Sequence, residues 1–97
     1  MELSGLLNGL DYFEVRGQNV DIKSLSCDSK KAGRNSLFFC IKGTKTDGHL
    51  YASDAVQGGA TALVVERFLP IPEVTQILVK DTRHAIDRKS TRLNSSH

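Results

Sequence analysis

The stretch SLFFCIKG, residues 36–43, decides the fold class of this chain of 97 residues. It is a continuous apolar run bounded by turn residues, a pattern typical of a β-strand that is buried on both faces. Two further strands are predicted by TALVVE at residues 61–66 and TQILV at residues 75–79. Cys40 lies inside the first run, and we therefore expect it to be a core residue.

The N-terminal quarter of the chain combines a helical pattern with strand patterns. LSGLLNGL, residues 3–10, has leucines at helical spacing, and we expect Ser4 to cap this helix and Gly9 to end it. The alternating stretches YFEV at residues 12–15 and VDIKSLSC at residues 20–27 predict short strands.

Strands and helices alternate through the second half of the chain. LYASDAVQGGA, residues 50–60, predicts a helix with Leu50 on its apolar face and a glycine pair at its end. Either Asp81 or Thr82 is placed to cap a further helix after the last strand. This alternation predicts an α/β domain with a mainly parallel sheet.

The charge distribution argues against a polynucleotide partner. The chain has 13 basic and 11 acidic residues, which gives a net charge of +2. Three of the basic groups and one of the acidic groups lie in residues 87–97, so residues 1–86 are neutral overall. Without a basic stripe, we expect no nucleic acid to bind.

Cysteine content and hydropathy indicate the compartment. Cys27 and Cys40 have neither CxxC nor zinc-type spacing, so we expect reduced thiols. No apolar run approaches the roughly 18 residues of a membrane span, and the acidic start Met1-Glu2 does not fit a signal peptide. These features predict a cytoplasmic protein that does not insert into a membrane.

The terminal stretch DRKSTRLNSSH, residues 87–97, interrupts the expected final helix. A frayed polar C-terminus is one interpretation. The other rests on a resemblance at the DNA level, because the same string results from in-frame translation of a common short-read sequencing adapter. We therefore expect residues 87–97 to be a non-native tail, and residues 1–86 to be an evolved domain that originally continued beyond Ile86.

CDSKK, residues 27–31, is the first of two polar segments that suit a ligand. Asp28 and Ser29 can form an Asx- or ST-turn, which would be local capping alone. Alternatively, the Ser29 hydroxyl and nearby backbone N–H groups point outward at the carboxyl end of a strand, where ligands of open α/β sheets bind.

The second polar segment is GTKTDGH, residues 43–49, between a buried strand and a helix. The hydroxyls of Thr44 and Thr46 and the ammonium of Lys45 suit an anionic ligand such as a phosphate ester. The chain contains neither the GxxxxGK[ST] pattern of a P-loop nor GxGxxG.

No catalytic or metal-binding set is predicted. No Ser-His-Asp arrangement or carboxylate pair can be assembled, and His49 is expected to be a hydrogen-bonded histidine at a helix start rather than a base or metal ligand. The residues alone thus predict a small α/β domain with a polar loop suited to a phosphorylated ligand.

The order of these segments resembles the N-terminal domain of the Mur ligases. That domain carries a D-S-R turn, a G-x-L-F-x-A-x-x-G strand, a D-G-H loop and an A-x-x-x-G-A passage from helix to strand, to which residues 25–66 are similar. LPIPEVTQILVKDTRHAI, residues 69–86, looks most like the MurE type. The resemblance implies a small three-layer α/β domain with a mixed, mainly parallel central sheet.

The resemblance also implies an activity for the full-length parent. MurE-type enzymes are ATP-dependent, magnesium-requiring ligases of peptidoglycan synthesis. They add the third stem-peptide residue, meso-diaminopimelate or L-lysine, to UDP-N-acetylmuramoyl-L-alanyl-D-glutamate. Residues 1–86 would supply the UDP-sugar-binding part, and ATP binding and catalysis would belong to other domains of the parent. We expect the chain alone to be inactive and monomeric.

Carried over position by position, the resemblance implies a set of substrate contacts. Ser29 is the main candidate for a contact with the nucleotide-sugar, and Thr44, Lys45 and Thr46 occupy the segment that meets the uracil and diphosphate region. Cys27 falls beside the uridine.

Two positions depart from the family pattern. Lys30 replaces the usual arginine, which weakens any planar, bidentate contact there. GRNSLF, residues 33–38, differs from the usual P-G-D-L-F turn, so the geometry of this turn is open. Two alternatives remain for the function: a stand-alone nucleotide-sugar-binding module, and the related Mur ligase that adds the terminal D-Ala-D-Ala dipeptide.

Overall fold

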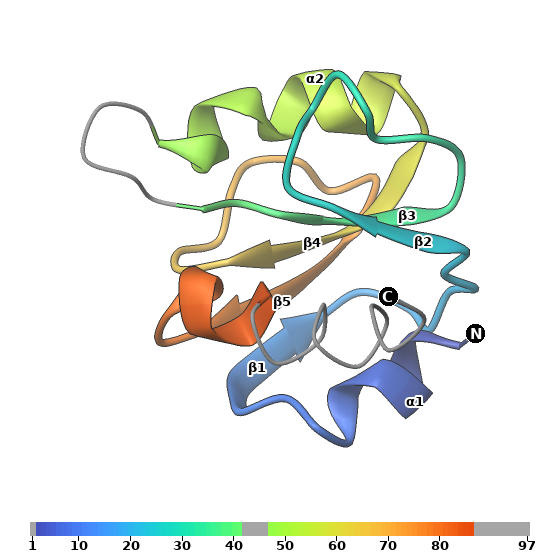
Figure 1. Cartoon of the computed structure of the whole chain (residues 1–97). Helices are drawn as coiled ribbons and strands as arrows, with labels where there is room; N and C mark the ends of the chain where they lie inside the picture. The colour runs from blue at the N-terminus through green and yellow to red at the C-terminus, as the bar shows by residue number, and fades with distance from the viewer. Residues whose placement is uncertain (1, 42–46, 87–97) are drawn as a thin grey trace, which may run out of the picture.

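A five-stranded sheet with the order β1-β5-β4-β3-β2 forms the centre of the molecule (Figure 1). The computed structural model describes residues 2–41 and 47–86. The strands are β1 (Tyr12–Arg16), β2 (Ser24–Ser26), β3 (Ser36–Phe39), β4 (Ala60–Val65) and β5 (Thr75–Val79). β2 to β5 pair in parallel, and only β1 runs antiparallel, against β5. The prediction of a mixed, mainly parallel α/β sheet is therefore confirmed.

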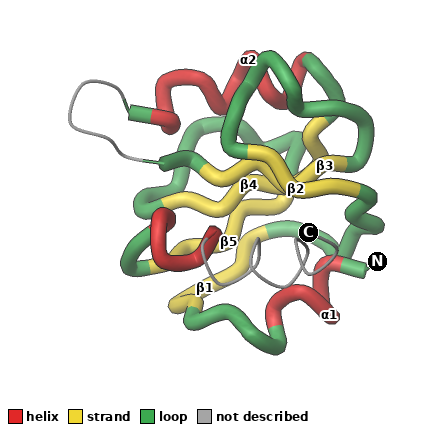
Figure 2. The backbone as a smooth tube through the Cα atoms, viewed as in Figure 1, coloured by secondary structure: helices red, strands yellow, loops and turns green. Residues whose placement is uncertain are grey.

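Helices cover both faces of the sheet and make three layers (Figure 2). The helical elements are α1 (Leu3–Leu7), the 3₁₀-helix η1 (Gly48–Tyr51), α2 (Ala52–Gln57) and a helical turn at residues 82–86. Ala52 and Ala55 of α2 pack into the core on one face. Leucines of α1 and Ala85 of the last turn pack into the core on the opposite face.

The central strands are buried on both faces because successive side chains point to opposite cores. In β3, Leu37 and Phe39 belong to the core beneath α1, whereas Phe38 and the following Cys40 belong to the core beneath α2. Burial, together with the nearby carboxylate of Asp47, raises the pKa of the Cys40 thiol to about 12, so this cysteine is a neutral core residue, as expected.

Two details of the helices differ from the predictions. Ser4 does not cap α1, because Glu2 occupies the N-cap position and the Ser4 N–H donates to Asn19 Oδ1 at 3.0 Å. Leu50 is 73% exposed rather than buried, because it lies in η1. A 3₁₀-helix has three residues per turn instead of 3.6, which moves Leu50 off the face that α2 buries.

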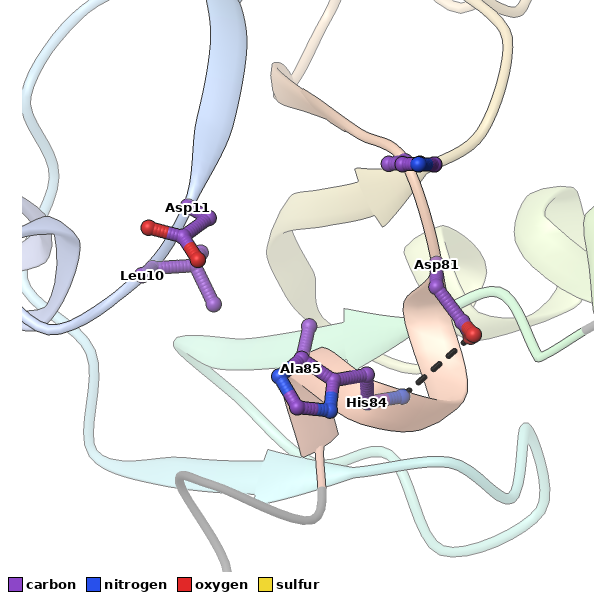
Figure 3. Close-up of a pocket in the computed structure, with 6 residues that line it drawn as sticks. Leu10, Asp11, Asp81, His84 and Ala85 are labelled. Atoms are coloured by element: carbon purple, nitrogen blue, oxygen red, sulfur yellow. Dashed lines mark hydrogen bonds between the residues drawn. The ribbon is translucent and has the colours of Figure 1, made fainter.

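The final helical turn is capped by Asp81, one of the two predicted candidates. Its carboxylate Oδ1 accepts from the backbone N–H groups of Arg83 at 3.0 Å and His84 at 3.2 Å. Figure 3 shows the second of these bonds. Thr82 is completely buried and uses its hydroxyl elsewhere.

The turn at residues 33–35 is formed by left-handed backbone at Asn35, with φ of 56°. Asparagine tolerates this conformation better than most residues. The Asn35 N–H donates to Gly59 O at 2.9 Å, and a Cβ on Gly59, which has φ of 121°, would lie 2.7 Å from Arg34 Cα. The altered turn sequence is thus accommodated by close backbone packing against the α2–β4 connection.

Within residues 2–41 and 47–86, no helix is long and apolar enough to cross a membrane.

Candidate functional site

The carboxyl ends of β2 to β5 meet along one edge of the sheet, because these four strands are parallel. The two polar segments singled out from the sequence follow β2 and β3, so they leave the sheet at this same edge. Ligands of open α/β sheets bind at this edge.

A hollow of about 440 Å³ lies between the segments that follow β2 and β3. Its lining comes from the turn after β2, the end of β3 and the start of η1: Cys27, Asp28, Ser29, Lys30, Phe38, Ile41, Gly48 and Tyr51. The structure therefore brings Ser29 and Cys27 together at one cavity. The other predicted contacts, Thr44, Lys45 and Thr46, lie outside the described residues.

The turn after β2 is held by residues other than Ser29. Asp28 Oδ1 accepts from the Lys30 N–H at 3.0 Å, which is an Asx-turn. The Ser26 hydroxyl donates to Asp28 O at 2.9 Å and accepts from the Asp28 N–H at 3.2 Å. Within the described part of the chain, the half-buried Ser29 has no hydrogen bond from its hydroxyl, which leaves this group available to a ligand in the hollow.

The two cysteines occupy contrasting environments. Cys27 is exposed and lines the hollow, whereas Cys40 is completely buried. Only Cys27 is thus placed to contact a ligand.

In the D-G-H segment at residues 47–49, hydrogen bonds of Asp47 and His49 hold the backbone beside the hollow in place. Asp47 Oδ1 accepts from the His49 N–H at 2.9 Å and lies 2.6 Å from His49 Nδ1. His49 Nε2 accepts from the Glu66 N–H at 2.9 Å, which requires the proton of the neutral ring to be on Nδ1. The ring is fully buried and bonds at both nitrogens, so His49 is the hydrogen-bonded histidine at a helix start that the sequence predicts.

Gly48 is required by close backbone packing. A Cβ at this position would lie 2.6 Å from Ile41 N and 2.8 Å from Ile41 O. The Gly48 N–H donates to Ile41 O at 2.7 Å, which joins two residues of the hollow's wall.

The carboxylate of Asp47 is held in its charged form. Partial burial alone would raise its pKa, but hydrogen bonds from the backbone and ring of His49 and from Arg67 outweigh that effect and lower the pKa from 3.8 to about 2. Arg67 Nη1 lies 3.3 Å from Asp47 Oδ2, and its side chain is 54% exposed.

Sequence reasoning missed two residues at this edge. Tyr51 is 43% exposed and lines the hollow, and Arg67 follows β4 at the carboxyl edge. The position of Arg67 just after a predicted buried strand was a usable signal. Tyr51 had no such signal, since its exposure depends on the 3₁₀ geometry of η1.

A second hollow, of about 290 Å³, lies between the start of β1 and the last helical turn (Figure 3). Leu10, Asp11, Lys80, Asp81, His84 and Ala85 line it. It mixes acidic and basic groups, and Asp81 is already engaged in capping. Neither Ser29 nor Cys27, the two predicted contacts within the described residues, lines it, so the hollow beside Ser29 is the better candidate.

The described residues offer neither a metal-binding group nor a P-loop. No group of three His, Cys, Asp or Glu residues in the described ranges could hold a metal, and the sequence has no P-loop. We therefore assign no step of phosphoryl transfer to this chain.

Comparison with known families identifies the relationship. Residues 21–93 match the family described as "Mur ligase family, catalytic domain". The chain belongs to the Mur ligase family. The match includes residues 87–93, a part of the terminal segment that we expected to be non-native.

The curated relatives are enzymes much longer than this chain. The UDP-N-acetylmuramoyl-L-alanyl-D-glutamate–2,6-diaminopimelate ligase of Clostridioides difficile is 45% identical over 84 residues, which is 86% of this chain and 17% of the relative. The ligase of the same name from Geobacillus kaustophilus is 46% identical over 87 residues, 89% of this chain and 18% of the relative. The UDP-N-acetylmuramoyl-tripeptide–D-alanyl-D-alanine ligase of Haemophilus influenzae is 45% identical over 72 residues, 74% of this chain and 16% of that protein.

Solved structures share the fold. MurF from Acinetobacter baumannii superposes with a TM-score of 0.72 at 26% identity, over 86% of this chain and 18% of that one. The MurF ligase from Thermotoga maritima, solved in complex with ADP, gives a TM-score of 0.60 at 24% identity, over 68% of this chain and 15% of that one, which shows the fold alone.

Proposed function

We propose that this Mur ligase family chain is the nucleotide-sugar-binding part of an ATP-dependent, magnesium-requiring cytoplasmic ligase of peptidoglycan synthesis. The parent enzyme adds the third stem-peptide residue to UDP-N-acetylmuramoyl-L-alanyl-D-glutamate. Two relatives named for 2,6-diaminopimelate, at 45% and 46% identity, support this amino acid over L-lysine. ATP binding and catalysis belong to parts of the enzyme beyond the residues described here.

The observation that carries the proposal is the hollow at the carboxyl edge of the sheet, with the Ser29 hydroxyl available beside it. A hydroxyl both donates and accepts, so it can pair with the carbonyl and N–H groups of a uracil ring or with a diphosphate oxygen. Cys27 and Tyr51 add the apolar or aromatic contact area that a flat base requires.

In this proposal, the second polar segment completes the contact with the nucleotide. Thr44, Lys45 and Thr46 supply two hydroxyls and an ammonium for the uracil and diphosphate. These three assignments rest on the sequence, since their positions lie outside the described residues.

Calorimetric titration of the chain with UDP-N-acetylmuramoyl-L-alanyl-D-glutamate tests the proposal directly. We expect binding that Ser29→Ala weakens about five-fold, the loss of one hydrogen bond to a ligand. Ser53→Ala, on the exposed side of α2, is the matched control and should bind as the wild type does. Equal affinity of wild type and Ser29→Ala would remove Ser29 from the site.

Kinetics of a full-length ligase that contains this domain separate the two substrates. Ser29→Ala should raise KM for the nucleotide-sugar and leave KM for ATP unchanged, because the contact is remote from phosphoryl transfer. Equal effects on both KM values would contradict the assignment.

The dipeptide-adding Mur ligase is the second candidate, favoured by the MurF structures with a TM-score of 0.72. The full-length enzyme distinguishes the two, since one accepts the UDP-linked dipeptide with diaminopimelate and the other accepts the UDP-linked tripeptide with D-Ala-D-Ala. A stand-alone binding module would bind UDP-sugar as tightly by itself as within any longer protein.

A further inference from the structure

A chain of hydrogen bonds connects the hollow beside Ser29 to the last helical turn. It begins at Gly48 in the wall of the hollow, continues through the buried ring of His49 to Glu66, and ends at Thr82. Covalent bonds make the steps from Gly48 to His49 and from the Glu66 backbone to its carboxylate, and hydrogen bonds of 2.9 to 3.0 Å make the others. No step depends on an exposed, screened ion pair.

Glu66 is the central member, because it bonds through both its backbone and its side chain. Its N–H donates to His49 Nε2 at 2.9 Å. Its carboxylate Oε2 accepts from the Thr82 N–H at 3.0 Å and from the Thr82 hydroxyl at 2.9 Å. A displacement of Thr82 is thereby transmitted to the residue whose backbone orients the His49 ring.

The His49 end of the chain determines where the wall of the hollow lies. The ring is fully buried and is bonded on one side to Asp47 and on the other to Glu66, so it has no other orientation that keeps both bonds. Gly48 lies between Asp47 and His49, and its N–H donates to Ile41 O at 2.7 Å. The position of this wall is therefore set by Ile41 on one side and, through the His49 ring, by Glu66 on the other.

The Thr82 end is equally constrained. Thr82 is 0% exposed, and it opens the helical turn that Asp81 caps. A hydrogen bond to a carboxylate is stronger than a bond between neutral groups, so the pair of bonds to Glu66 Oε2 fixes this turn to the end of β4.

We propose that Glu66 and Thr82 are positioning residues for the nucleotide-sugar site, although neither lines the hollow. The inference rests on the proposed function. Because coupling between two sites is reciprocal, a nucleotide-sugar that stabilises the wall at Gly48 also stabilises the helical turn at residues 82–86.

The first test uses the unaltered full chain and amide hydrogen exchange, with UDP-N-acetylmuramoyl-L-alanyl-D-glutamate as the probe. At saturation we expect exchange of the Thr82 amide to slow at least about five-fold, the lower end of typical coupling between sites. The amide of Ser4, which donates to Asn19 Oδ1 and takes no part in the path from Gly48 to Thr82, should not change. Binding without any change at Thr82 would overturn the inference and leave the proposed function intact.

The second test is Thr82→Val, which keeps the side-chain shape and removes the hydroxyl donor. We expect the affinity for the same probe to fall about five-fold, and Thr82→Ser, which restores the donor, to recover most of it. Arg83→Ala, exposed in the same turn, is the control and should bind as the wild type does. Wild-type affinity in a folded Thr82→Val chain would overturn the inference. Absence of probe binding to the wild type would overturn the proposed function and, with it, the inference.

Discussion

The two polar segments at the carboxyl edge of the sheet are chemically similar but use their side chains differently. In the turn at residues 27–31, Asp28 and Ser26 hold the backbone and leave the Ser29 hydroxyl unused by the described residues. At residues 47–49, both polar side chains are consumed by bonds within the protein. In the first segment, the fixed backbone leaves the Ser29 hydroxyl available to a ligand. In the second, the hydrogen bonds fix the wall of the hollow at Gly48.

The difference shows that polarity alone does not identify a ligand contact. Asp47 and Ser29 both lie in polar segments that the sequence marks as suited to a ligand. The two residues differ in their hydrogen bonds. A buried polar group is nearly always paired, so a side chain without a partner beside a cavity is the better candidate for a ligand contact.

Gly48→Ala should have the largest effect on stability. The new Cβ would lie 2.6 Å from Ile41 N, a backbone atom that cannot move aside cheaply. We expect a loss of about 3 kcal/mol in the free energy of unfolding, measured by urea denaturation. Gly33→Ala, where a Cβ meets nothing within 4 Å, is the control. A neutral Gly48→Ala would show that the wall beside the hollow is not tightly held.

His49→Ala should cost about 2 kcal/mol, because it removes a buried ring and leaves the Glu66 N–H without its acceptor. His84→Ala, at an exposed position, provides the comparison and should change stability by less than about 0.5 kcal/mol. Similar losses of stability for the two histidine variants would contradict the structural role of the His49 hydrogen bonds.

The charge of Asp47 should make stability depend on pH. Its pKa is lowered to about 2 in the folded protein from an ordinary 3.8, so its contribution is fully present above about pH 4 and is lost as the pH falls toward 2. Against Asp47→Asn, we expect an advantage of about 1.5 kcal/mol for the wild type near pH 6, the size of a hydrogen bond to a charged group. Chemical denaturation at several pH values measures it, and a gap that stays constant down to pH 2 would contradict the assignment.

Ser26→Ala and Ser29→Ala form a matched pair with the smallest effects. Ser26→Ala removes two hydrogen bonds that hold the turn and should cost about 1 kcal/mol. Ser29→Ala should leave the free energy of unfolding within about 0.5 kcal/mol of the wild type while weakening nucleotide-sugar binding. If Ser29→Ala lowered the free energy of unfolding more than Ser26→Ala did, the roles assigned to the two serines would be wrong.

The fold was largely predictable because the buried strands have an unambiguous pattern. The apolar run within SLFFCIKG, residues 36–43, can be buried only if both faces of its strand are covered, and both faces of β3 are covered. Helix boundaries were less predictable: Ser4 is a good N-cap residue, yet the bridge from Glu2 to Asp21 starts the helix earlier. Local preference gave way there to a contact with a segment distant in sequence.

The candidate site was predictable only in outline. The carboxyl edge follows from strand order, but the division of labour between Ser26 and Ser29 depends on torsion angles that no sequence pattern specifies. The contact roles of Ser29, Cys27, Thr44, Lys45 and Thr46 stay predictions, as do the monomeric state and the non-native origin of residues 87–97.

The pairing of β1 with β5 has a consequence for how the protein is made. Residues 12–16 emerge early from the ribosome, but their only strand partner in the described sheet, residues 75–79, is synthesised much later. Until then β1 has no strand partner on either side, and it carries Tyr12 and Phe13, which stay exposed in the folded protein. Closing such a distant pair is slow compared with local contacts. The nascent chain therefore passes through an interval in which both edges of β1 are open to wrong partners, and the synthesis of β5 closes one of them.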